Sequence, residues 1–473
     1  MIDHLHALDV AILGAFLIFQ TWIGFRLLRR RGVRNDAAEF LLGGRQLTLP
    51  AFVMTLVSTW YGGILGVGEY SYQYGVSNWL VFGVPYYLWA VVFALFLARR
   101  ARRTLFFSIP DHLQNAYGNG PAIAGGIIVF VMTVPAAYVL MLGTLGKLLL
   151  GWPLWAGIVL GTAVSIAYVF LGGFQSLLRT DKIQFIAMFA GFAVIIPLCF
   201  VDFGGWTFLK GNLPATHLTW HGGNSGWYIL SWYFIAAATL VEPAFYQRCY
   251  AAKSESVAKR GIFVSVLFWI VFDFMTTTAG LYARAALPGL TDGQESFPAL
   301  AARILPPGLM GIFLIGMLAT VISTVDSYMF LSAISLGRDV ICRLRTATDR
   351  LVNIATRWAL LASAVLAVTL ALMSQSVIGL WRDLGSIGVP ALLLPVLGTF
   401  RQSQTRVPPG RVVAWMLVPA VVAAFWIGLR AAMGAYPWGV EPIFPGLATS
   451  AVIASVNLLW PQTPKTPSRQ VQR

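Results

Sequence analysis

Residues 58–69 read Ser58-Thr59-Trp60-Tyr61-Gly62-Gly63-Ile64-Leu65-Gly66-Val67-Gly68-Glu69, and they interrupt an apolar segment that extends over 48–70. A helix needs about 20 apolar residues to cross a bilayer, and each glycine weakens a helix by roughly 1 kcal/mol relative to alanine. Carbonyl groups freed by a break inside lipid need new partners, which a cation or a bound solute can provide. The segment therefore predicts a broken membrane helix, with glycine used only for tight helix packing as the alternative.

A second interruption lies in Thr239-Leu240-Val241-Glu242-Pro243, inside the apolar segment 227–246. Pro243 removes a backbone donor and clashes with the preceding turn, and a carboxylate at membrane depth is costly unless it has a partner. Two interrupted helices at corresponding positions of two halves are typical of transporters built from inverted repeats. An inert proline kink near the cytoplasmic end is the alternative.

The composition of the whole chain agrees with a membrane protein. An ordinary soluble domain has about 25% charged residues, whereas this chain of 473 residues has 11% charged and 58% hydrophobic residues. This excludes a soluble enzyme, a disordered chain and a disulfide scaffold, and it indicates an all-α polytopic membrane protein with about thirteen transmembrane helices. The apolar segments centre on 8–28, 48–70, 79–98, 122–146, 154–171, 183–201, 227–246, 261–283, 307–335, 352–373, 378–400, 411–432 and 443–460.

We expect these helices to form a single integral membrane domain over residues 1–473. It would comprise an N-terminal peripheral helix and cytoplasmic loop (1–47), a first five-helix repeat (48–201), a second five-helix repeat (227–400) and two peripheral C-terminal helices (411–460). Residues 461–473 are polar and contain prolines, which predicts a short disordered cytoplasmic tail.

The positive charges predict the orientation of the chain in the bilayer. If the N-terminus is outside, 27 of the 33 lysines and arginines fall in inside segments, as the positive-inside rule requires. We therefore predict a multi-pass plasma-membrane protein with its N-terminus outside and its C-terminus in the cytoplasm. The net charge of +15 would favour a nucleic-acid partner in a soluble protein. Here the arginines are topology signals, and no nucleic acid is expected.

Hydroxyl side chains line one face of the apolar segment 307–335. Thr320, Ser323, Thr324 and Ser327 follow i, i+3, i+4, i+7 spacing, so they share a helix face. A dehydrated Na⁺ needs several neutral oxygens in a small cage, and hydroxyls plus carbonyls from a broken helix can supply them. In the alternative reading each hydroxyl bonds back to its own helix. Asp181 opens the segment 183–201, where a simple helix cap is an equally good interpretation.

Four ordered motifs resemble the sodium/solute symporter family, which includes sodium-coupled proline, pantothenate, sialic acid and sugar transporters. They are Glu39-Phe40-Leu41-Leu42-Gly43-Gly44-Arg45, Gly172-Gly173 with Thr180-Asp181-Lys182-Ile183-Gln184, Gln247-Arg248 with Ala251-Ala252-Lys253, and Ala319 to Ser327. The resemblance covers roughly residues 39–400. It implies a secondary active transporter with a leucine-transporter-like ten-helix core of two inverted repeats, which is not an enzyme and needs no cofactor besides Na⁺ as coupling ion.

The resemblance also implies where Na⁺ would bind, between the first and eighth core helices. Carried over by position, the ligands are the carbonyls of Ser58, Tyr61 and Thr320 and the hydroxyls of Ser323 and Thr324. Asp181, Asp326 and Ser327 match a second-cation region of some family members, although Asp326 stands where some relatives have a hydroxyl.

The solute is expected between the two interrupted helices, where Trp60, Gly62, Gly63 and Glu242 would line a central pocket. Trp60 stands where the proline transporters carry an aspartate, and Glu242-Pro243 replaces a polar pair common in the family. The sequence therefore predicts uptake of a small organic solute without identifying it, and it leaves the oligomeric state open.

Three alternatives remain at this stage. A carrier of the same fold driven by H⁺ could use Asp181, Glu242 and Asp326 as a relay. A membrane-embedded sensor would need an output domain, for which the predicted tail is too short. An intramembrane enzyme would need a metal cluster or a nucleophile–base pair at depth, and no histidine lies in any predicted span.

Overall fold

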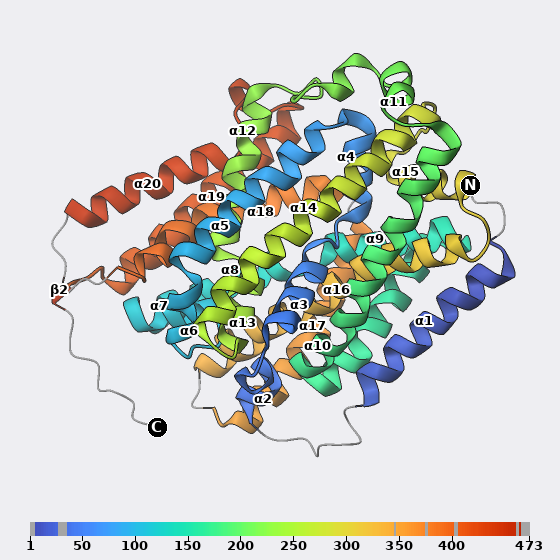
Figure 1. Cartoon of the computed structure of the whole chain (residues 1–473). Helices are drawn as coiled ribbons and strands as arrows, with labels where there is room; N and C mark the ends of the chain where they lie inside the picture. The colour runs from blue at the N-terminus through green and yellow to red at the C-terminus, as the bar shows by residue number, and fades with distance from the viewer. Residues whose placement is uncertain are drawn as a thin grey trace.

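The computed structural model describes residues 5–26, 36–344, 347–373, 377–401, 405–459 and 463–464. These residues form one bundle of packed helices, with α1 at one edge and the C-terminal α20 at the opposite edge (Figure 1). Within the described ranges the only strands are β1 (Thr405–Arg406) and β2 (Thr463–Pro464), which pair antiparallel. The described part of the chain is therefore all-helical apart from a ladder of two residues in each strand.

The first helices along the chain are α1 (Ala7–Arg26), α2 (Ala37–Leu42), α3 (Leu49–Trp60), α4 (Ile64–Tyr74), α5 (Val84–Phe96), α6 (Ala98–Arg103), α7 (Ile109–Tyr117), α8 (Asn119–Thr133), α9 (Ala136–Leu150), α10 (Leu154–Phe203) and α11 (Trp206–Asn212). They are followed by α12 (Gly226–Ile235), α13 (Pro243–Ala251), α14 (Glu255–Ala286), α15 (Ser296–Ile304), α16 (Leu309–Ile334), α17 (Asp349–Met373), α18 (Val377–Gly398), α19 (Pro409–Met433) and α20 (Ile443–Leu459). Short 3-10 or π segments are η1 (Gly43–Arg45), η2 (Trp79–Gly83), η3 (Ala215–Leu218), η4 (Ala236–Val241), η5 (Gly293–Glu295), η6 (Ser335–Ile341), η7 (Cys342–Leu344) and η8 (Pro437–Gly439).

Many of these helices are long enough to span a bilayer. Among the described residues, ten helices or continuous helix runs are apolar and long enough to cross a membrane, and the bent pair α3–α4 adds an eleventh. Both interruptions expected from the sequence are present. α3 and α4 are bent by 60° around Tyr61–Gly63, and α12 passes through the 3-10 segment η4 before α13 begins at Pro243.

α10 departs from the expected pattern. Its 50 residues would extend about 75 Å at 1.5 Å per residue, more than twice the roughly 30 Å of the hydrocarbon core. Gly173 divides it with φ 55° and ψ −144°, and a Cβ at this position would lie 2.6 Å from the Phe40 carbonyl oxygen. The helix then resumes at once, so residues 174–182 are helical rather than the polar connection expected before a span at 183–201.

The core of the bundle is the contact between α10 and α16. A Cβ added to Gly191 of α10 would lie 2.8 Å from the Cα of Gly316 on α16, so the two backbones touch. α16 is buried along nearly its whole length. The helices that carry Asp181 and the hydroxyl face are therefore held together by close packing.

Backbone hydrogen bonds join the segments that flank the two broken helices. The Leu47 amide, just before α3, donates to the Ala251 carbonyl at 2.9 Å, and the Lys253 amide donates back to the Leu47 carbonyl at 2.9 Å. The Gln247 side chain donates to the Leu41 carbonyl at 3.3 Å. Motifs that are about 200 residues apart in sequence thus meet at one end of the bundle.

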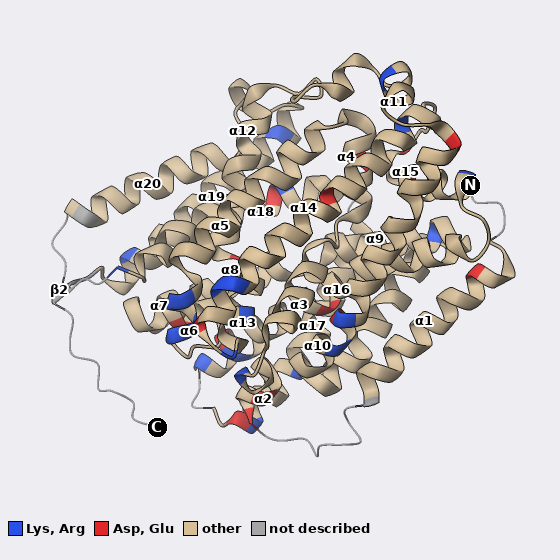
Figure 2. Cartoon of the chain, in the orientation of Figure 1, with Lys and Arg blue, Asp and Glu red and all other residues tan. Residues whose placement is uncertain are grey.

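That end of the bundle is rich in positive charge, with Lys and Arg gathered around α6, α7 and α13 (Figure 2). The predicted cytoplasmic loop after α1 lies largely in residues 27–35, and the predicted tail lies largely in residues 465–473. Both of these segments are outside the described residues. Residues 463–464 of the tail form β2 instead of a disordered end.

Candidate functional site

The break between α3 and α4 is packed directly against α16. Thr59 lies in the last turn of α3, next to the break, and its carbonyl accepts a hydrogen bond from the Thr324 hydroxyl at 2.8 Å. A Cβ on Gly62 would lie 2.3 Å from the Cβ of Thr324. Gly62 is therefore required for this approach, so helix breaking and close packing act together and are not alternatives.

The five residues expected to bind Na⁺ lie near the end of α3, in the break that follows it and in α16, and all five are buried. The Thr324 hydroxyl also donates to the Thr320 carbonyl at 3.1 Å, so it joins a carbonyl of the broken helix to one of α16. The Ser323 hydroxyl points away from its own helix and donates to Asp181 at 2.9 Å. The Thr320 and Ser58 hydroxyls bond back to their own helices, to the carbonyls of Met317 and Thr55 respectively, which leaves their backbone oxygens as candidate ligands.

Asp181 lies at the side of this contact, inside α10. Its carboxylate accepts hydrogen bonds from Thr55 of α3 and Ser323 of α16. The capping interpretation of Asp181 is wrong, because the helix starts well before it, at the Gly173 break. Asp181 instead connects three helices in a fully buried position.

Arg248 of α13 is the residue that the sequence reasoning placed incorrectly. The positive-inside count of 27 lysines and arginines includes Arg248 as part of an inside segment, but its side chain is fully buried. Its guanidinium donates to the hydroxyls of Thr59 and Ser327 at 2.9 Å each, and it lies 3.9 Å from the Asp181 carboxylate. The sequence does contain a signal for its burial, because Arg248 lies in the mainly aromatic and apolar run Phe245-Tyr246-Gln247-Arg248-Cys249-Tyr250.

Asp326 is turned to another part of the bundle. It accepts a hydrogen bond from the Tyr168 hydroxyl of α10. Gln20 of α1 and Ser165 and Gln184 of α10 belong to the same buried polar group. Asp181, Asp326 and Ser327 are thus neighbours, but each is directed to different partners.

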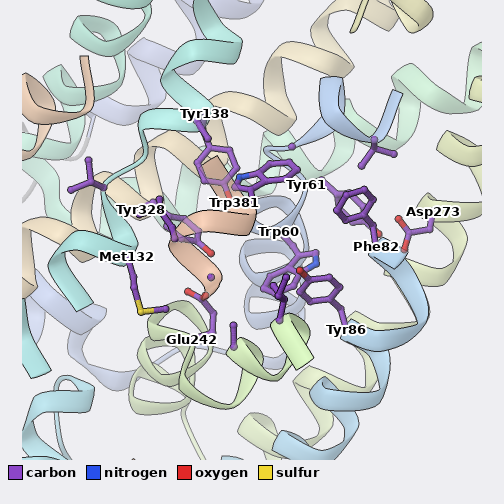
Figure 3. A pocket seen from close by; sticks show the side chains of 18 residues that line it. Trp60, Tyr61, Phe82, Tyr86, Met132, Tyr138, Glu242, Asp273, Tyr328 and Trp381 are labelled. Atoms are coloured by element: carbon purple, nitrogen blue, oxygen red, sulfur yellow. The ribbon is translucent and has the colours of Figure 1, made fainter. Parts of the chain in front are cut away.

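A central cavity of about 170 Å³ lies between the two breaks. Three of the four predicted solute residues line it, namely Trp60, Gly63 and Glu242, whereas Gly62 faces Thr324 instead. Figure 3 shows the Glu242 carboxylate directed between Trp60 and Tyr328. The first break and the second break therefore both contribute to the cavity wall.

The sequence reasoning missed most of the cavity lining. Five of the aromatic residues there come from five further elements: Tyr86 of α5, Phe82 of η2, Tyr138 of α9, Tyr328 of α16 and Trp381 of α18. A second carboxylate, Asp273 of α14, lines the far side and accepts a hydrogen bond from Tyr87. Asp273 was detectable as an isolated acid in an apolar span, whereas nothing in the sequence distinguishes these aromatic residues from the others in the chain.

Comparison with known proteins gives relatives over most of the chain. A profile of the sodium:solute symporter family matches residues 40–402. The chain is 25% identical over 473 residues to the osmoregulated proline transporter OpuE of Bacillus subtilis, covering 93% of this chain and 92% of that protein. It is 24% identical to the high-affinity choline transporter 1 of Drosophila melanogaster over 80% of this chain, and it spans 64% of that longer protein.

The fold also has a solved counterpart. A Na⁺-coupled sialic acid symporter in a substrate-bound outward-open state superposes with a TM-score of 0.80, 15% sequence identity and coverage of 97% of this chain and 100% of that one. The similarity shows a shared arrangement of helices. With the family profile covering more than three quarters of the residues, the conclusion is that this chain belongs to the sodium:solute symporter family.

Proposed function

We propose that this protein is a secondary active transporter that couples the entry of Na⁺ to the uptake of a small organic solute by alternating access. The observation that carries the proposal is the contact between the Thr324 hydroxyl and the freed Thr59 carbonyl. It brings hydroxyls of α16 and carbonyls of a broken helix to one buried point, which is the oxygen set that a dehydrated Na⁺ requires. Relatives named as proline and choline transporters support a small organic solute.

The finer architecture belongs to the same proposal. We count α10 as two spans divided at Gly173 and the shorter α20 as one, which gives thirteen spans with the bent pair. Residues 48–201 and 227–400 would then be two inverted five-helix repeats, each starting with a broken helix. The proposed membrane orientation keeps the N-terminus outside and the α6–α7–α13 end, where the positive charge gathers, in the cytoplasm.

The proposed Na⁺ ligands are the carbonyls of Ser58, Tyr61 and Thr320 and the hydroxyls of Ser323 and Thr324. Asp181 is the proposed centre of a second cation region, because it joins three helices beside the first site. Asp326 and Ser327 would complete that region only if they turn away from Tyr168 and Arg248.

Na⁺ binding can be tested without knowing the solute. Titrating Na⁺ against K⁺ at constant ionic strength and pH should raise the melting temperature of the purified protein, because a ligand of the folded state stabilises it. Ser323→Ala and Thr324→Ala each remove one oxygen and should weaken Na⁺ binding by about tenfold or more, since hydrogen-bond or ligand contacts to a charge contribute about 1.5–3 kcal/mol.

Ser332→Ala is the matched control, because Ser332 is a buried serine on the same helix whose hydroxyl donates to the Met329 carbonyl of that helix at 2.9 Å. It should leave the Na⁺ titration unchanged. A wild-type protein that responds equally to Na⁺ and K⁺ would contradict Na⁺ coupling, and a response to pH instead would favour H⁺.

A further inference from the structure

We propose, on the basis of the symport function above, that the transported solute is a small organic cation. Its ammonium group would bind inside the aromatic wall of the central cavity, against the carboxylate of Glu242. The cavity supplies negative charge, aromatic faces and no competing cation, and these three properties are argued in turn.

The charge of the cavity is negative. Glu242 and Asp273 both line it, and no Lys, Arg or His is found among its described lining residues. Asp273 accepts a side-chain hydrogen bond from Tyr87, whereas Glu242 accepts from a backbone amide at the long distance of 3.4 Å, so we take Glu242 as the carboxylate that binds the ligand. A buried carboxylate is costly unless it is paired, and a cationic ligand would supply that pair.

Glu242 makes no ion pair in the described structure. Its carboxylate accepts from the Ala244 amide at 3.4 Å and faces Tyr328. The charge of Arg248 acts on it from a distance, but the guanidinium is used by the hydroxyls of Thr59 and Ser327 and lies beside Asp181. Among the described residues, Glu242 is therefore a buried carboxylate that has no cationic partner.

Aromatic rings surround the space in front of Glu242 (Figure 3). The Trp60 and Tyr86 ring centroids are 5.4 Å apart on one side. On the other side Tyr138 lies 5.4 Å from Tyr328 and 5.9 Å from Trp381. Aromatic faces attract an ammonium ion through their quadrupole, an interaction of about 2 kcal/mol or more in a desolvated site, and such cages recognise quaternary ammonium groups.

The same geometry disfavours an anionic or zwitterionic solute. A carboxylate would need the positive end of a half-helix, and both candidates are covered. At the N-terminus of α4, a Cβ on Gly63 would lie 1.9 Å from the Trp381 ring, so the indole lies directly on this position. At the N-terminus of α13, Glu242 itself accepts the free Ala244 amide.

The test uses probes of different charge on the wild-type protein in saturating Na⁺. Choline and tetramethylammonium carry a quaternary nitrogen, 3,3-dimethyl-1-butanol replaces that nitrogen by carbon, glycine betaine adds a carboxylate, and pantothenate is an anion. We expect choline or tetramethylammonium to raise the melting temperature at concentrations at least about tenfold below those needed for the other three. Equal or stronger stabilisation by the neutral alcohol, the zwitterion or the anion, or no response to either cation, would overturn the proposal.

Two variants locate the binding site. Glu242→Gln should weaken stabilisation by choline at least tenfold while the Na⁺ titration alone stays as in the wild type. Tyr86→Phe, which keeps the ring, should bind choline better than Tyr86→Leu, which removes it. Unchanged choline binding in Glu242→Gln and Tyr86→Leu would place the cation elsewhere. A wild-type protein whose melting temperature does not respond to Na⁺ would instead contradict the symport function. Failure of the organic-cation proposal and failure of the symport proposal are therefore distinguishable.

Discussion

The side chain of Arg248 links α13 to the three helices that form the proposed cation region. It is fully buried and donates to Thr59 and Ser327 beside Asp181. Arg248→Met should lower the free energy of unfolding by about 3–5 kcal/mol, because Asp181 then keeps a buried charge without its cation. Thermal unfolding in detergent measures the change.

A double variant separates pairing from packing at this position. Arg248→Met combined with Asp181→Asn removes both charges, so it should be more stable than Arg248→Met alone. If the two substitutions simply add, the pair does not stabilise the fold and the ion-pair interpretation fails.

Asp181 itself tests the second cation. Asp181→Asn should reduce the charge moved per solute, or the Hill coefficient for Na⁺, without abolishing solute binding. Each cation lost removes about 2.3 kcal/mol per 100 mV from the driving force, roughly 50-fold in accumulation. Uptake into proteoliposomes with simultaneous current recording measures the ratio. An unchanged ratio with reduced stability would assign Asp181 a purely structural role.

Among the described elements, α10 and α16 make the most extensive contact of the core. Gly191→Ala should lower the melting temperature and slow transport, because its Cβ would lie 2.8 Å from the Gly316 backbone and force the helices apart. Gly14→Ala in α1 is the matched control, since no atom lies within 4 Å of its added Cβ. That substitution should be neutral or stabilising by up to about 1 kcal/mol.

The short helix α7 is attached to η6 and η7 by a cluster of ionic side chains. Asp111 pairs with Arg338 at 3.0 Å and also contacts Arg343. Burial acts to raise the pKa of Asp111, but the two arginines outweigh it and lower the pKa to about 2. A depressed folded-state pKa stabilises above the ordinary value of 3.8, and this stabilisation is lost as the pH falls towards 2.

Asp111→Asn should therefore lower the free energy of unfolding by about 2 kcal/mol at pH 7. The difference from the wild type should shrink between pH 4 and about 2, where the wild-type carboxylate takes up its proton. Thermal melts of the variant and the wild type at about pH 7, 4 and 3 measure this difference. A difference that is constant with pH would mean that the amide disturbs packing only.

At the scale of the whole molecule, the orientation in the bilayer can be measured with single cysteines. The three native cysteines are buried, so they give a low labelling background. Lys210→Cys in α11 should react with a membrane-impermeant maleimide added to intact cells, because α11 is expected outside. Lys253→Cys should react only after the membrane is opened. Both positions are exposed, and the reverse pattern would invert the proposed orientation.

The sequence predicted features that depend on local chemistry. Glycines and a proline inside apolar runs predicted both helix breaks, because backbone hydrogen bonding in lipid leaves few other outcomes. The partners of polar groups could not be predicted in this way. Arg248 looks cytoplasmic by sequence position, and the aromatic cavity wall is assembled from helices far apart in the chain. Tertiary packing alone decides which tryptophan or tyrosine faces the cavity.

The buried guanidinium of Arg248 has an electrical consequence. In the proposed transport cycle, a charge that is covalently part of the carrier returns to its starting position, so over a complete cycle it would transfer nothing across the field. If α13 moves during that cycle, Arg248 would contribute only a transient, capacitive displacement when the voltage is stepped, whereas coupled Na⁺ would produce a steady current. The voltage dependence of the conformational step would then be separable from the charge delivered with the solute.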